Sequence, residues 1–323
     1  FNPSATLTRG AAAKIICNMI LGPTTAGALK ADAAPYKDVA VDNTFAGYIA
    51  FCAKEGIISG YADGTFRPAA PLTGYAFMKM LLGALGYDAD IEGYNNPGSF
   101  GIQVAKQAIG IGLNKGLKDT FDGTKAVTRE EACLYALNTL KATMVEYDQK
   151  IIANVNGAQV TVGTSLAKEV KWNIAEKKND GNIKDDEYVQ FAEKYFPKLE
   201  LEIGNGIYGR PANTWKIKSK EVGTYAKTPA LTYTKEVKGY EIYEDLGKPE
   251  VGDVYTYTNS ESGVEAAEKL LAKKSDTDKT SQTKIGGNGV LVEVFTEDNG
   301  DDVDVKIVII NTKIGEVADV TEN

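Results

Sequence analysis

The sequence predicts an α+β multidomain protein: an all-α N-terminal region of three repeats, followed by a β-rich, sandwich-like module with helical insertions. Related helical segments recur three times before residue 148. Beyond that point apolar and polar residues alternate, as they do in strands. The charge divides there too, because residues 1–147 hold 13 basic and 13 acidic side chains and the remainder carries the whole net charge of −8. We therefore expect domains at 1–147 and 148–323.

The repeats align through the starts of their helices. The opening FNPSATLTRGAAAKIICNMILG matches FRPAAPLTGYAFMKMLLGALG without a gap, and GLNKGLKDTFDGTKAVTREEACLYALNTL is a third, more divergent copy. The equivalent threonines are Thr8, Thr73 and Thr128, at spacings of 65 and 55 residues. This spacing places the repeats at about 1–35, 36–92 and 93–147, the first of them truncated.

Each repeat is predicted to contain a helix, a structured loop and a second helix. Thr128 and Glu131 have the form of a capping box, and Thr8 and Thr73 are simpler N-caps. Apolar residues follow each threonine at helical spacing. Upstream, TFAGYIAFCAKEG and GIQVAKQAIGIG are amphipathic and end in glycine.

The loop of the second repeat is GIISGYADGTFRP, residues 56–68. Asp63 and Gly64 predict a turn, and Phe66 is expected to return to the core as an aromatic contact. This loop therefore connects the two helices in a fixed way.

These residues resemble a known family. YKDVAVDNTFAGYIAFCAKEGIISGYADGTFRPAAPLTGYAFMKMLLGALG looks like an S-layer homology (SLH) repeat, with its Phe-x-Asp-Val opening, its Gly-Tyr-x-Asp-Gly-Thr-Phe-Arg-Pro loop and its Thr-Arg-Ala-Glu helix start. The resemblance is specific in the second repeat and partial in the others. It implies a pseudo-threefold, three-pronged helical spindle that attaches surface proteins non-covalently to secondary cell-wall polysaccharide of bacteria, often through pyruvylated sugars.

The sequence departs from the family pattern at the motif arginine. It is present as Arg9 and Arg129, but the middle repeat has Gly74. The third loop keeps Asp119 and Phe121 and loses the Arg-Pro pair. At most two of the three potential sites are therefore expected to be well equipped.

An acidic glycan needs fixed cations and amide donors. Arg9 and Arg129 follow helix caps, where free amides and the helix dipole favour anions, and an arginine fork can hold a carboxylate with two hydrogen bonds. Arg67 and Tyr61 come from the preceding loop and are expected to line the same groove. The alternative is that each arginine only pairs with a nearby glutamate, which contributes under about 1 kcal/mol, and that Tyr61 is a packing residue.

Two aspartates of the motif, Asp63 and Asp38, are further candidates for polysaccharide binding. For both, a structural role is the favoured interpretation, because Asp63 sits in a turn-forming sequence.

The second region is predicted to contain a hairpin, KIIANVNGAQVTVG, turning at Asn156 and Gly157. Further predicted strands are NTWKIKS, ALTYTKEV, GYEIYEDL, DVYTYTN, GVLVEVFTE and VDVKIVIINT, and the predicted helices are DDEYVQFAEKYF and GVEAAEKLLAKKS. YGRPANTWKIKSKEVGTYA and the closing VIINTKIGEVADV are similar to the segment that follows SLH repeats in clostridial-type surface proteins.

Several functions are disfavoured by composition. Histidine is absent, which removes Ser-His, Cys-His and His-metal mechanisms. Cys17, Cys52 and Cys133 lack metal-ligand spacing, and we expect all three to be buried free thiols. Residues 176–187 resemble an EF-hand loop, but lysines occupy two of its ligand positions, so no metal site is predicted.

No cofactor fingerprint is present, and we expect no cofactor. The net charge disfavours nucleic acid as a partner, and no apolar run is long enough to cross a membrane. Because the chain begins inside a repeat and ends abruptly, we expect further sequence on both sides.

The leading hypothesis is a non-enzymatic, extracellular protein of the cell wall or S-layer. Residues 1–147 bind acidic secondary cell-wall polysaccharide, pyruvylated sugars included, and residues 148–323 form a spacer or a module that self-associates in a surface array. The alternatives are a surface enzyme that hydrolyses glycans and an adhesin, each carried by an SLH anchor.

Overall fold

The computed structural model describes residues 2–117, 120–147, 151–155, 158–162, 166–175, 177–300 and 302–312. It divides into two compact units, residues 1–199 and residues 200–323. Each unit is described by itself.

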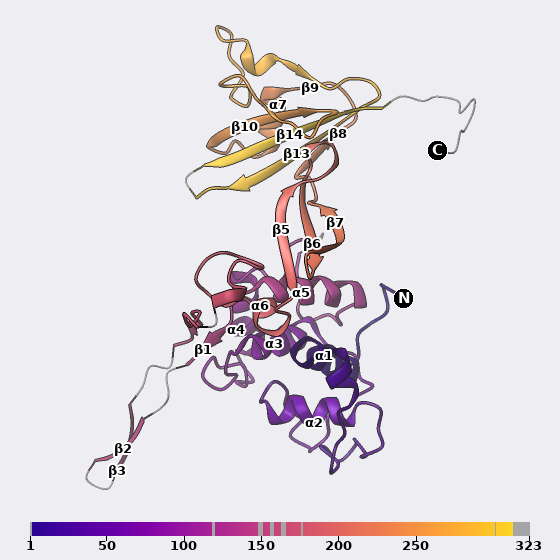
Figure 1. The fold of residues 1–323 in the computed structure, drawn as a ribbon, viewed down its shortest axis with the longest axis vertical. Helices are drawn as coiled ribbons and strands as arrows, with labels where there is room; N and C mark the ends of the chain where they lie inside the picture. The colour runs from indigo at the N-terminus through magenta and orange to yellow at the C-terminus, as the bar shows by residue number, and fades with distance from the viewer. Residues whose placement is uncertain are drawn as a thin grey trace. The chain divides into compact units, whose positions relative to one another are not determined.

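The first unit is mainly helical (Figure 1). Its helices are α1 (Arg9–Gly27), α2 (Ala46–Lys54), α3 (Gly74–Leu85), α4 (Phe100–Gly110), α5 (Arg129–Lys141) and α6 (Phe191–Tyr195). Helix α1 packs against α2, and α3 packs against α4. The second helix of one predicted repeat therefore contacts the first helix of the next.

The three threonine caps form as the sequence predicts. The Thr8 hydroxyl accepts from the Ala11 amide, Thr73 caps α3 in the same way, and Thr128 with Glu131 completes a capping box. Each cap satisfies an amide that would otherwise lack a partner in the first turn.

The residues just before the caps join the three helix starts in a closed ring. The Leu7 amide donates to the Val127 carbonyl, Val127 donates to Leu72, and Leu72 donates back to Leu7, each at 2.9 Å. All three side chains are buried at 4% exposure or less. The ring fixes each helix start against the loop of another segment, which is the arrangement that positions the site.

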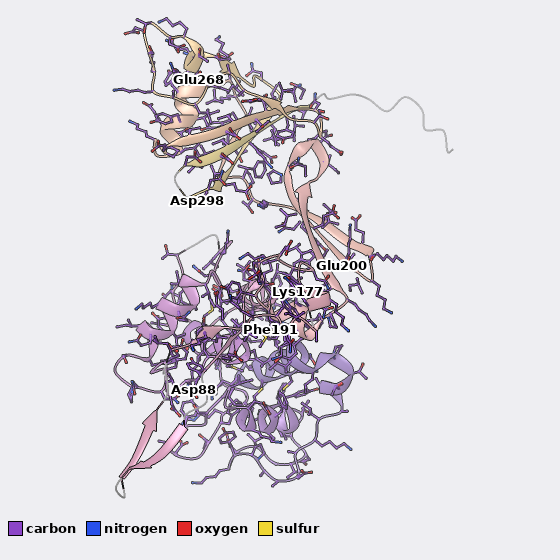
Figure 2. All side chains as sticks on the ribbon, turned by 60° about the vertical axis from the view of Figure 1, so that its left-hand side comes forward. Asp88, Lys177, Phe191, Glu200, Glu268 and Asp298 are labelled. Carbon is purple, nitrogen blue, oxygen red and sulfur yellow. The ribbon has the colours of Figure 1, made fainter. Side chains whose placement is uncertain are left out.

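The helical core extends beyond residue 147. After β1 (Val145–Glu146) and β4 (Lys168–Glu169), which pair antiparallel, the chain returns to the helices. Phe191 is fully buried among the side chains of the helical core (Figure 2), and its amide donates to the Ala142 carbonyl at 2.9 Å. The compact unit consequently ends at residue 199, whereas the change in sequence pattern lies at 147/148.

The predicted hairpin is present. Strands β2 (Ile151–Val155) and β3 (Ala158–Val162) pair antiparallel. Its predicted turn at Asn156 and Gly157 lies outside the described residues. A short 3₁₀ helix, η1 (Lys177–Asn179), follows later in the same unit.

The second unit contains sheets of mixed size. Strands β5 (Leu199–Asn205), β6 (Pro211–Ile217) and β7 (Lys220–Ala226) form one sheet in that order. A five-stranded sheet has the order β11 (Val264–Glu265), β10 (Val251–Thr258), β14 (Val303–Asn311), β13 (Val290–Asp298) and β8 (Leu231–Tyr233). Strands β12 (Lys284–Ile285) and β9 (Val237–Lys238) pair separately, and the short helices are η2 (Ile207–Gly209), α7 (Gly239–Asp245) and η3 (Thr280–Gln282).

The larger core of the second unit lies on one face of the five-stranded sheet. Val292 and Ile307 from the sheet are fully buried there, and Ile242 from α7 packs on them with Ile285 of β12. A helix and a two-stranded pair therefore cover this face, instead of the second large sheet of a sandwich. On the other face of the sheet lies a smaller cluster of Tyr257, Phe295, Val308 and Ile310.

Two segments of the second unit differ from the sequence-based prediction. GYEIYEDL, predicted as a strand, is helix α7, because Glu241 accepts from the Lys238 amide at 2.7 Å and caps a helical turn. GVEAAEKLLAKKS, predicted as a helix, begins with edge strand β11. Its Leu270 and Leu271 are both buried in the core, so tertiary packing overrides the helical pattern of the segment.

One further helix is shorter than expected, and one thiol is not where we expected it. DDEYVQFAEKYF forms only the single turn of α6. Cys17 and Cys52 are buried free thiols, as predicted, with their sulfur atoms 3.6 Å apart. Cys133 is exposed on α5, so the prediction of three buried thiols is wrong for this residue.

Replacing Phe191 by alanine should lower the free energy of unfolding of the first unit by about 3–5 kcal/mol, because a fully buried ring leaves a cavity. The matched control is Ile174→Ala, since Ile174 is 94% exposed and its loss should cost less than about 0.5 kcal/mol. Urea unfolding followed by Trp172 fluorescence, in a Trp215→Phe background, measures both. Equal effects of the two changes would contradict a shared core.

Candidate functional site

The loop of residues 56–68 is held in shape by two aspartates. Asp63 accepts from the Thr65 amide at 2.9 Å and from the Thr65 hydroxyl at 2.6 Å, and its other oxygen pairs with Arg67 at 2.8 Å. The hydrogen bonds from Thr65, together with Arg67, lower the pKa of the Asp63 carboxyl to about 2. Asp63 is therefore engaged in building the loop.

Asp38 fixes the same loop from outside. Its two carboxylate oxygens accept from the backbone amides of Phe66 and Arg67, each at 2.7 Å. Burial opposes the ionisation of Asp38, but these amides outweigh that effect and hold its pKa below the ordinary value. Arg67 is held with a φ of 60°, in the left-handed region, which is strained for a residue with a side chain.

Arg9, the first residue of α1, reaches across to this loop. Its Nε donates to the Phe66 carbonyl at 2.7 Å and its Nη2 to the Ser59 carbonyl at 3.2 Å. The guanidinium carbon lies 4.4 Å from the centre of the Phe66 ring and 4.9 Å from that of Tyr61. Burial lowers the pKa of Arg9, with Tyr61 opposing, and the group stays cationic at neutral pH.

Tyr61 contacts two arginines, Arg9 of α1 and Arg67 of the loop. The centre of its ring is 4.2 Å from the Arg67 guanidinium carbon and 4.9 Å from that of Arg9. The residue is 41% exposed. The structure thus brings together Arg9, Tyr61, Arg67, Asp63 and Asp38 around one loop.

The backbone amides at the start of α1 are not available to a ligand. The Arg9 amide donates to the Ala70 carbonyl at 3.0 Å, and the Gly10 amide donates to Pro68 at 2.9 Å. The next amide, that of Ala11, is capped by Thr8. The expectation of free amides beside Arg9 is therefore wrong, because the neighbouring loop already satisfies them.

A cleft of about 580 Å³ opens beside Arg9. Arg9 and Tyr61 line one part of it, and Lys79 of α3 and Phe100 of α4 line another. No aspartate or glutamate is among its lining residues in the described part of the chain. The cleft combines two cationic side chains with aromatic walls.

The equivalent position in the next groove is closed. A Cβ at Gly74 would lie 3.0 Å from the Gly123 Cα and 3.2 Å from the Phe121 ring. Tyr75 packs edge-on against Phe121 with the ring centres 5.9 Å apart. An arginine side chain has no room there, so the absence of the motif cation coincides with a filled groove.

Arg129 does not line the Arg9 cleft. It begins α5, and its amide donates to the Ala5 carbonyl at 2.9 Å. The start of α5 is thus bonded to the first repeat, as the start of α1 is bonded to the second repeat through Arg9 and Ala70. Asp119, from the third loop, lies outside the described residues.

Lys79, Asn95 and Phe100 are among the lining residues that the sequence-based prediction missed. Lys79 has a recognisable signal, because it is the only charged residue of α3, GYAFMKMLLGAL. Asn95 and Phe100 have none, since they come from the next predicted repeat and meet the cleft only through the fold.

Metal-binding clusters of three or more suitable side chains do not occur among the described residues. The EF-hand-like segment 176–187 ion-pairs internally instead, through Lys184 and Asp186 and through Lys177 and Asp180. No described helix is both long and apolar enough to span a bilayer.

A model of the S-layer homology domain family matches residues 35–74. These residues include the loop that contacts Arg9. This chain carries an S-layer homology domain. Such domains bind cell-wall polymers and anchor surface proteins, so the chain belongs outside the cell, at the wall or S-layer.

Two relatives are similar over part of their length. An uncharacterized cell wall amidase of Bacillus anthracis is 29% identical over 145 residues, which are 43% of this chain and 26% of that protein. Cell surface glycoprotein 1 of Acetivibrio thermocellus is 34% identical over 82 residues, which are 25% of this chain and 4% of that protein. The chain therefore spans about a quarter of the first relative and a small part of the second.

The stabilisation that Asp63 gives the loop should be lost only in strong acid. Its folded-state pKa is lowered to about 2, so the contribution is complete above the ordinary aspartate pKa, about 4, and disappears as the pH falls through about 2. Carboxyl NMR titration and amide exchange of Thr65 measure this. In the control Asp63→Asn, Thr65 exchange should lose this pH response, and a titration midpoint near 4 would contradict the assignment.

Proposed function

We propose that the first unit binds an acidic secondary cell-wall polysaccharide in the Arg9 cleft and thereby anchors the protein to the wall. The observation that carries the proposal is the cleft's composition. Two half-buried cations, Arg9 and Lys79, line it with aromatic rings and without a carboxylate among the described lining residues. No described carboxylate lies within ion-pairing distance of either cation. An anionic sugar would supply that missing counter-charge.

The aromatic walls suit the apolar faces of sugar rings. Tyr61 and Phe100 both line the cleft, one from the loop of residues 56–68 and one from α4. Carbohydrates present C–H groups on one side and hydroxyls on the edge, so stacking and charge contacts act together. A pyruvylated sugar, which carries a carboxylate on the ring, has both features.

We propose the same repeat arrangement for the whole helical region: three S-layer homology repeats in a pseudo-trimer. The hydrogen-bond ring through Leu7, Leu72 and Val127 supports this, because equivalent residues contact each other in cyclic order. The second unit would then be a structural spacer or a module for self-association in a surface array. The chain itself would have no catalytic role.

Replacing Arg9 with glutamine should weaken binding to purified wall polysaccharide at least ten-fold, because the variant loses the charge that faces the cleft. Arg67→Gln is the matched control, since Arg67 is half exposed and already paired with Asp63; it should change the affinity less than three-fold. Co-sedimentation of the full chain with cell-wall sacculi and titration calorimetry with soluble polysaccharide measure both.

The variant Arg9→Lys separates the structural role of Arg9 from the role of its charge, because lysine keeps the positive charge. Thermal unfolding of each variant shows whether the loop remains folded. Unchanged binding by a folded Arg9→Gln protein would exclude the Arg9 cleft as the anchoring site.

Peptidoglycan incubated with the full chain should release neither new reducing ends nor new amino groups, because anchoring requires no bond cleavage. The cell wall amidase relative makes this test necessary. Release that depends on the protein would favour the surface-enzyme alternative. Binding of the second unit to host or neighbouring-cell surfaces would favour an adhesin.

A further inference from the structure

Lys79 occupies an unusual position for a lysine. It lies on α3 between Met78 and Met80, both buried, and is the only charged residue in the twelve of that helix. Its side chain is half-buried and lines the same cleft as Arg9. An apolar residue at this position would extend the core, so the lysine introduces a charge at a site where burial alone would favour methionine or leucine.

The ammonium of Lys79 has only neutral neighbours at contact distance. Its Nζ donates to the side-chain oxygen of Asn95 and lies 5.9 Å from the centre of the Phe100 ring. Asn95 in turn donates to Asp90 at 2.5 Å. In the described part of the chain no carboxylate lies within 4 Å of Nζ. Because an ammonium has three donors, two remain for a ligand.

The charges around Lys79 are unbalanced within the cleft. Burial lowers the pKa of Lys79, Asp90 raises it, and Arg9 lowers it further. The buried Tyr94 hydroxyl of the same lining has no hydrogen-bond partner among the described residues. The cleft thus has two cations that disfavour each other and a donor without an acceptor, and an incoming oxyanion would relieve the repulsion between the cations.

We infer that Lys79 is a specificity-determining residue of the Arg9 cleft: it contacts the acidic substituent of the bound glycan and selects carboxylated over neutral polysaccharide. The inference rests on the proposed function. Arg9 presents its charge from the start of α1 and Lys79 presents its own from α3, so a carboxylate in the cleft is attracted by both cations. Asn95 holds the ammonium in place before the ligand arrives, which reduces the ordering cost of binding.

A simpler role for Lys79 would be to extend its alkyl chain along the core and its ammonium into solvent. The two roles differ in one measurable respect. If Lys79 only packs, its replacement changes the affinity for charged and neutral polymers equally. If it contacts the carboxylate, its replacement has no effect on a polymer from which the carboxylate has been removed. The test therefore varies the protein and the polysaccharide together.

The probes are the secondary wall polysaccharide of the source bacterium and the same polymer after chemical reduction of its carboxyl groups. Lys79→Gln in the full chain should weaken binding of the intact polymer at least ten-fold and of the reduced polymer less than two-fold. Lys79→Arg, which keeps the charge, should stay within three-fold of wild type on both. The matched control, Lys106→Gln, changes an exposed lysine of α4 that does not line the cleft and should leave both affinities unchanged.

The outcomes separate this inference from the proposed function. If Lys79→Gln binds the intact polymer like wild type while Arg9→Gln does not, Lys79 has no part in recognition and the anchoring proposal stands. Equal weakening on the intact and reduced polymers would assign Lys79 a packing role. If neither variant affects binding, both proposals fail. Thermal unfolding verifies that Lys79→Gln is folded. If it is not, the affinities of Lys79→Arg for the intact and the reduced polymer are compared instead.

Discussion

Three backbone hydrogen bonds, which join Leu7, Leu72 and Val127 in a closed ring, set the geometry on which the rest of the first unit depends. Each of these residues precedes a threonine cap, so the ring brings three helix starts to one place. Each helix start then meets the loop of another segment. The helix that begins in one repeat is therefore completed by the loop of the next, and a site between them cannot be assembled from one repeat alone.

Two of the positions created by this ring are chemically unequal. At the first, Arg9 lines a cleft that is also lined by residues of α3 and α4. At the second, Gly74 is packed tightly against Phe121 and Gly123, and the groove is filled. The repeat gives a common backbone arrangement, and single side chains decide which copy is open to a ligand. The third loop, which diverges in sequence, supplies the Phe121 and Gly123 that close this groove.

Much of the first unit could be predicted from the sequence, because its signals are local. The threonine caps and the Asp63 turn each depend on residues within a few positions. Features that depend on distant segments could not be predicted: Phe191 joins the helical core from far along the chain, and Asn95 reaches the cleft from another repeat. In the second unit, the prediction of a strand at GYEIYEDL is wrong: Tyr240 and Tyr243 stand at helical spacing, and Glu241 caps the helix α7 to which they belong.

The cleft is cationic although the sequence around it is not. Residues 1–147 are neutral overall, yet the aspartates nearest to Arg9 are turned to other partners. Asp38 accepts two loop amides, and Asp63 accepts from Thr65 and pairs with Arg67. These carboxylates build the loop instead of neutralising the cleft, and Arg9 is left to face the cavity. The same bonds hold the loop rigid before any ligand binds. Loop order and local positive charge thus have one cause, the engagement of acidic side chains by the backbone, and a polymer of negative charge meets a surface that is already arranged for it.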